Sequence, residues 1–106
     1  MSKLTDENLQ EKLANIKDKI CCLLFTAEWN PFDAEVNTWS TELHKPEFKD
    51  KVAIGKINVE NFPLTCLKYS IKNLPSVMLF REGRFLASII GAHKTEDVLN
   101  FVRRYL

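Results

Sequence analysis

The residues of this chain that could do covalent chemistry are its three cysteines, Cys21, Cys22 and Cys66. A cysteine thiolate can attack a disulfide or bind a metal ion. An odd number is a poor disulfide framework, and the sequence holds no Cys-x-x-Cys pair for a zinc knuckle or a dithiol redox motif. Cys21 and Cys22 adjoin within an apolar run, where they would point to opposite faces of a strand. We predict that both are core residues and that Cys66 is the candidate reactive thiol.

The two histidines, His44 and His93, are distant in the sequence. His44 is expected at the end of a helix, where the carbonyl dipoles favour a cation, and His93 is expected in a surface loop. A metal site needs several nitrogen, sulfur or oxygen ligands that converge on one ion. Because these histidines share no set of ligands, the sequence predicts no metal site and no cofactor.

The first half of the chain predicts a helix, a strand and a second helix. Apolar residues at helical spacing predict a helix over residues 5–19. The continuous apolar run 20–27 is typical of a strand that is buried on both faces. Asn30 is expected to cap the next helix, with Pro31 at its first position, because that amide needs no partner. Pro46 is expected to stop or kink this helix.

The second half predicts a strand over 52–59, a short helix over 61–69 and a hairpin of strands 76–80 and 84–90. Thr95 starts a last helix, whose expected buried residues are Val98, Leu99, Val102, Tyr105 and Leu106. Strand-helix-strand units imply parallel pairing, and the hairpin adds antiparallel strands. The predicted fold class is therefore α/β, with a small mixed sheet of about four strands and helices on both faces.

Length and charge argue against several classes of function for this chain. A chain of 106 residues suits one domain, over residues 1–106. The formal net charge is +1, with acids and bases interleaved, so no basic stripe indicates nucleic acid and no polybasic run indicates a membrane surface. No apolar run reaches the length of a membrane span, and the first residues hold no signal-peptide core. We expect a cytoplasmic or otherwise reducing location.

Five short motifs occur in the order and at the spacing found in the thioredoxin family, which this chain resembles over nearly its whole length. They are Phe25-Thr26-Ala27-Glu28-Trp29, Lys56-Ile57-Asn58-Val59-Glu60, Lys68-Tyr69-Ser70-Ile71 with Leu74-Pro75-Ser76, Phe80-Arg81-Glu82-Gly83, and Gly91-Ala92. The resemblance implies the thioredoxin fold and a cis peptide bond before Pro75.

The working motif of that family, Cys-Gly-Pro-Cys, is replaced here by Asn30-Pro31-Phe32-Asp33. Disulfide exchange needs one thiolate to attack and a second thiol to resolve the mixed disulfide, and Asn30 and Asp33 can do neither. The family's buried aspartate, which assists proton transfer, corresponds to Leu24. Lys56 has thereby lost its acidic partner and is interpreted as an ordinary strand lysine. The resemblance therefore predicts a domain without dithiol redox chemistry.

Three functions remain open. The first is a redox-inactive adaptor that binds an extended peptide or protein segment in the vestigial groove, which the resemblance places at Trp29, Pro31, Phe32, Leu74, Pro75, Gly91, Ala92 and His93. The second is an atypical oxidoreductase that uses Cys66 in thiol-disulfide exchange or glutathionylation. The third is a stability or assembly module with no open groove, in which a homodimer would bury Trp29, Phe32 and Leu74. The sequence does not fix the oligomeric state.

Overall fold

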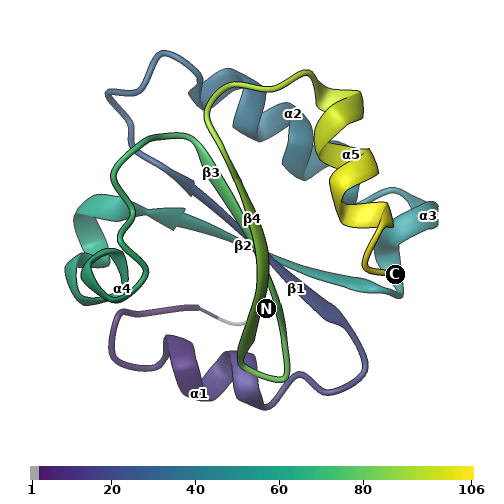
Figure 1. Ribbon diagram of the computed structural model, residues 1–106, viewed down its shortest axis with the longest axis horizontal. Helices are drawn as coiled ribbons and strands as arrows, with labels where there is room; N and C mark the ends of the chain where they lie inside the picture. The colour runs from purple at the N-terminus through teal and green to yellow at the C-terminus, as the bar shows by residue number, and fades with distance from the viewer. Residues whose placement is uncertain (1–2) are drawn as a thin grey trace.

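A computed structural model describes residues 3–106 (Figure 1). The elements alternate between helix and strand before a final hairpin and helix. Their bounds are α1 Leu9–Ala14, β1 Ile20–Thr26, α2 Asp33–Leu43, α3 Pro46–Lys49, β2 Val52–Asn58, the 3₁₀ turn η1 Val59–Asn61, α4 Pro63–Lys68, β3 Ser76–Arg81, β4 Arg84–Ile90 and α5 Thr95–Arg103.

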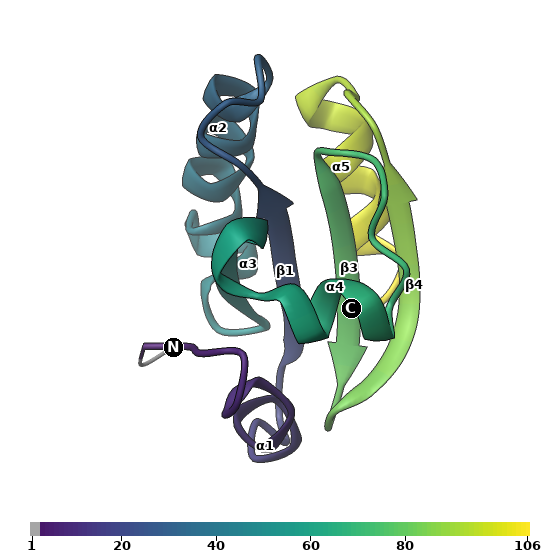
Figure 2. The same ribbon diagram turned by 90° about the vertical axis from the view of Figure 1, so that its left-hand side faces the viewer.

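The four strands form one mixed sheet in the order β2-β1-β3-β4. β1 pairs with β2 in parallel and with β3 antiparallel, and β3 pairs with β4 antiparallel. Every residue of β1 is buried, as the continuous apolar run predicted. Helices cover both faces of the sheet, and β4 is the outermost strand on one side (Figure 2). The predicted α/β class with a mixed sheet is confirmed.

Each face of the sheet has its own hydrophobic core. One core joins β1 and β3 to the helices α2, α3 and α5, with Trp39 as its largest side chain. The other joins the opposite face to α1 and to the segment around α4. Cys22 belongs to the first core and Cys21 to the second, and both are free thiols. Their predicted burial on opposite faces is therefore confirmed.

The first helix is shorter than the sequence predicts. Hydrogen bonds between the side chains and backbone amides of Thr5 and Asn8 close a turn, with Thr5 N–H to Asn8 Oδ1 at 2.8 Å and Asn8 N–H to Thr5 Oγ1 at 3.1 Å. α1 follows at Leu9 and ends at Ala14. The expected extension to residue 19 is wrong because the chain must turn there to enter β1.

The C-terminal helix packs as predicted except at its end. Val98, Leu99 and Val102 are buried, and Tyr105 is half-buried. Leu106 is exposed, contrary to expectation, because α5 ends at Arg103 and its helical face does not extend that far. Of the helices within residues 3–106, none is both long and apolar enough to cross a membrane.

Candidate functional site

Residues 30–33 lie where β1 ends and α2 begins. Asn30 is only 8% exposed, and its Oδ1 accepts a hydrogen bond of 2.8 Å from the backbone N–H of Phe32. This bond closes a turn over residues 30–32, and α2 begins at Asp33 with Phe32 as its N-cap. The expectation that Asn30 is the N-cap and Pro31 the first helical residue is therefore wrong. The amide of Asn30 caps the preceding turn instead.

Asp33 is held by two strands of the sheet. Its Oδ1 accepts a hydrogen bond of 3.1 Å from Thr26 Oγ1 at the end of β1. The Lys56 ammonium on β2 lies 3.5 Å from the same oxygen and donates to Asn37 Oδ1 at 2.7 Å. The interpretation of Lys56 as a lysine without an acidic partner is wrong, because the carboxylate at position 33 serves in that role.

Leu24 contains no group that could transfer a proton. Its side chain is completely buried in the core beneath α2 and α5. In the sheet it stands between Lys56 on β2 and Val77 on β3. Position 24 is therefore filled by hydrocarbon.

A groove with a volume of about 490 Å³ opens beside this turn. Its lining residues are Trp29, Asn30, Val59, Cys66, Ile71, Lys72, Asn73 and Leu74. Trp29 is 67% exposed, so most of the indole surface is open to a partner. The peptide bond between Leu74 and Pro75 is cis. Within residues 3–106, no backbone hydrogen bond engages the N–H or the C=O of Leu74.

The structure brings only part of the predicted groove together. Trp29, Asn30 and Leu74 line it, whereas Pro31 and Phe32 are exposed on the neighbouring turn. Pro75 is buried, and its carbonyl accepts a hydrogen bond of 2.7 Å from Gly91 N–H.

The loop after β4 lies next to the groove but does not line it. Ala92 and His93 are exposed there. His93 Nε2 lies 3.0 Å from the carbonyl oxygen of Ile90, to which it donates when it carries the proton. This contact holds the imidazole against the end of β4.

Sequence reasoning missed five groove residues, Val59, Cys66, Ile71, Lys72 and Asn73. The last three precede Leu74-Pro75 directly, so their proximity in the chain was an available signal. Val59 begins η1 directly after β2, and the packing of η1 against α4 places it in the groove.

Cys66 lines the same groove, which the sequence did not indicate. It is partly buried on α4, and its Sγ lies 4.0 Å from the carbonyl oxygen of Val59. Desolvation raises the pKa of this thiol above its usual value, and the nearby carboxylate of Asp6 raises it further. Burial also raises the pKa of Cys21 to about 11 and that of Cys22 to about 12. None of the three thiols is in a setting that favours the thiolate.

A potential metal site is not formed by the described side chains. Within residues 3–106, no three His, Cys, Asp or Glu side chains gather in an arrangement that could hold an ion.

Comparison with known proteins identifies the family. The thioredoxin family model matches residues 1–104. The chain belongs to the thioredoxin family. It is 33% identical to the thioredoxin of Buchnera aphidicola from Acyrthosiphon pisum over 101 residues, which cover 94% of this chain and 91% of that protein. It is 26% identical to the thioredoxin of Griffithsia pacifica over 107 residues, which cover the whole chain and 95% of that protein. The four-stranded mixed sheet with flanking helices is accordingly a thioredoxin fold.

Proposed function

We propose that this chain is a redox-inactive member of the thioredoxin family that binds an extended segment of a protein partner in the groove beside Trp29. The proposal rests on the hydrogen bonds made by the two residues at the motif positions. Asn30 and Asp33 replace both sulfurs and are engaged in internal hydrogen bonds. No dithiol remains there to reduce a disulfide, whereas the groove next to these residues is open.

The backbone of Leu74 supplies the means of binding. Its N–H and C=O have no partner within residues 3–106, and an extended peptide could pair with them as an added strand. The exposed indole of Trp29 offers apolar area at low entropic cost, which is a common feature of binding sites. Main-chain pairing would provide affinity, and the groove would select side chains. We place this activity in a reducing compartment such as the cytoplasm.

Relatives that share the fold are named thioredoxins, so loss of redox activity must be tested directly. The test is insulin reduction in the presence of dithiothreitol. We expect the wild-type protein to give no rate above that of dithiothreitol alone. The matched variant carries Asn30→Cys together with Asp33→Cys and should gain measurable activity, with Asp33→Cys alone as control. Wild-type turnover would overturn the proposal.

Binding is tested by affinity capture of partners, followed by measurement of the affinity of each purified partner. Trp29→Ala should weaken the binding of a genuine groove partner by about 1–3 kcal/mol, as expected for a buried aromatic anchor. The matched control is Leu67→Ala, which removes an apolar side chain that is 79% exposed on α4 outside the groove. If a partner binds the Trp29→Ala and Leu74→Ala variants as tightly as it binds Leu67→Ala, the groove is not its binding site.

A second candidate function is supported by the position of Cys66 in this groove. Its thiolate could attack oxidised glutathione, form a mixed disulfide and release one glutathione thiolate. The raised pKa of Cys66 opposes this reaction at neutral pH. Native-state titration with a chromogenic disulfide distinguishes the two functions. A fast thiol that is lost on Cys66→Ser would support exchange, and slow reaction of all three thiols would exclude it.

A further inference from the structure

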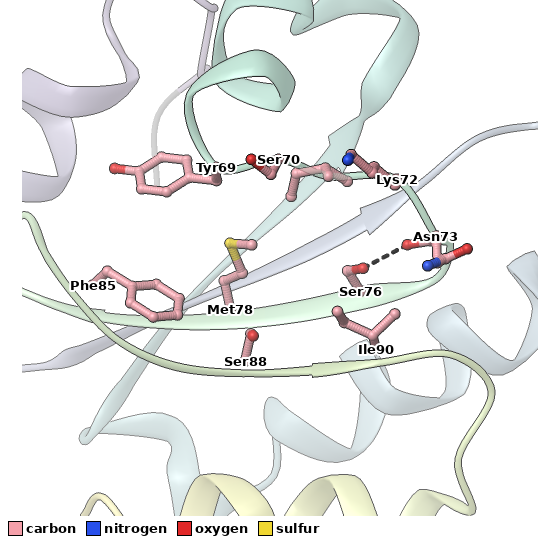
Figure 3. Close-up of a pocket in the computed structure, with 10 residues that line it drawn as sticks. Tyr69, Ser70, Lys72, Asn73, Ser76, Met78, Phe85, Ser88 and Ile90 are labelled. Carbon is pink, nitrogen blue, oxygen red and sulfur yellow. Dashed lines mark hydrogen bonds between the residues drawn. The ribbon is translucent and has the colours of Figure 1, made fainter.

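A second cavity lies on the other side of the Ile71–Asn73 loop, with a volume of about 350 Å³. Figure 3 shows that β3 and β4 form its floor and that the segment from Tyr69 to Asn73 forms its wall. Met78 projects into it from β3, and Ile90 borders it from β4. The loop is fastened to the sheet, because Ser76 Oγ donates a hydrogen bond of 2.6 Å to the carbonyl of Asn73.

Aromatic side chains form the end of this cavity that lies near the start of β4. The rings of Tyr69 and Phe85 stack with their centroids 6.4 Å apart, and both pack against Phe80. Phe85 is nevertheless half exposed, as is Ile90 at the opposite end of β4. The cavity is therefore a preformed, mainly apolar pocket that extends to β4, the edge strand of the sheet.

The strand beside the cavity has an unpaired edge. Within residues 3–106, β4 pairs only with β3, so its outer backbone groups face no other strand. Proteins usually protect such an edge with charged residues or proline. β2, at the opposite edge, carries Lys56 near its middle. From Phe85 to Ile90 β4 has neither charge nor proline, although its register with β3 shifts between Leu79 and Phe80, an irregularity of the kind that can also protect an edge. β4 could therefore accept another extended segment.

The segment that contains this edge is rich in basic residues, although the acidic Glu96 and Asp97 follow it in the first turn of α5. Residues 68–94 carry five basic side chains and one acidic one, although the whole chain has 15 and 14. Lys72 lines the cavity, Arg84 begins β4, and Lys94 follows its end. A surface of this sign attracts acidic partners and repels basic ones.

We propose that the outer edge of β4 and the adjoining cavity form a second docking site, which receives an acidic extended segment of a partner protein with an apolar side chain in the cavity. The backbone edge would pair with the segment. Lys72 and Arg84 would attract its carboxylates. A second copy of this chain is disfavoured, because antiparallel pairing of two β4 strands would bring Arg84 of one copy towards the Lys94 end of the other.

The cavity and the Trp29 groove share Ile71, Lys72 and Asn73, so the amides of β4, which line the cavity alone, distinguish the two sites. The test follows two-dimensional amide NMR spectra of the isotope-labelled protein during titration with a synthetic peptide of alternating Glu and Ile around a central Phe. The matched peptide has Lys in place of Glu. We expect the acidic peptide to shift the amides of Phe85–Ile90 and Tyr69–Asn73, and to bind at least about tenfold more tightly at low salt than the basic one.

Charge reversal supplies the decisive comparison. Lys72→Glu with Arg84→Glu changes two exposed side chains and should weaken binding of the acidic peptide at least about tenfold while favouring the basic peptide. Lys49→Glu on α3 is the control, and it should leave the affinity unchanged, as should Trp29→Ala. Rising salt should weaken the wild-type complex.

Several results would overturn the proposal. Equal binding of the acidic and basic peptides would remove its electrostatic basis. Shifts confined to Trp29 and Leu74 would assign the peptide to the groove instead. Shifts of β4 that depend on protein concentration alone would identify a second copy as the occupant. Tighter binding of a single-stranded oligonucleotide to the same amides would identify a nucleic-acid surface.

Discussion

The ammonium of Lys56 lies 3.5 Å from Oδ1 of Asp33. The carboxylate that faces this lysine thus comes from the start of α2, and Leu24 on β1 has none. Thr26 donates to the same oxygen, so Asp33 forms a polar link between β1, β2 and α2.

Replacing Asp33 should therefore affect stability. Asp33→Ala is expected to lower the free energy of unfolding by about 0.5–1.5 kcal/mol, because it removes a hydrogen bond and a partly exposed ion pair. Urea unfolding measures the change. Glu35→Ala in the same helical turn is the control for the loss of an acid near the helix N-terminus. If both substitutions lower the free energy of unfolding by the same amount, the link to Lys56 does not contribute to stability.

Restoring an acid at position 24 should be strongly destabilising. Leu24 is completely buried, and an uncompensated carboxylate there should cost at least about 3 kcal/mol at neutral pH. Burial would raise the folded-state pKa of the new carboxyl, so Leu24→Asp should lose stability as pH rises above the unfolded-state value of about 4. Leu24→Asn cannot ionise and should lack this trend. Unchanged stability of Leu24→Asp across this range would show that Lys56 reaches the new carboxylate.

Asp6 should make folding sensitive to acid. Its carboxylate accepts hydrogen bonds from Leu64 N–H at 2.7 Å, Thr65 N–H at 2.9 Å and Thr65 Oγ1 at 2.6 Å, which tie the N-terminal segment to the start of α4. Desolvation raises the pKa of Asp6, but these bonds outweigh it and hold the pKa below the ordinary 3.8.

The sign of the effect follows from that lowered pKa. The stabilisation is fully present above the unfolded-state value and is lost as pH falls through the folded-state pKa. Below about pH 4, wild-type stability should therefore approach that of Asp6→Asn. Urea unfolding at a series of pH values measures this convergence. Asp18→Asn, in the exposed turn before β1, is the control. A constant gap between wild type and Asp6→Asn down to pH 2 would contradict the assignment.

Two glycines with positive φ should differ in their tolerance of a side chain. Gly83 has φ +83°, and an added Cβ would lie 3.0 Å from Gln10 Nε2 and 3.2 Å from Ala14 Cα. Gly91 has φ +94°, but nothing lies within 4 Å of an added Cβ. We expect Gly91→Ala to cost about 1 kcal/mol from backbone strain alone. Gly83→Ala should cost about 1–3 kcal/mol more because α1 must shift. Thermal unfolding of both variants tests the order.

The sequence alone determined the sheet and its helices. The continuous apolar run of β1 predicts burial on both faces, and periodicity and turn chemistry predict the β3–β4 hairpin. Pro46 marks the break between α2 and α3, because proline cannot continue a helix but suits its first position. These features depend on residues that are near one another in the chain.

Only the tertiary structure decided which distant side chains meet. Packing of the sheet against α2 brings Lys56 to Asp33, and the position of α4 carries Cys66 to Trp29. Asp6 reaches Thr65 across 59 positions. No local pattern encodes such contacts, because each depends on how two separately formed elements dock. For the same reason the sequence indicated part of the groove beside Trp29 and Leu74 but not the cavity between the Tyr69–Asn73 segment and β4.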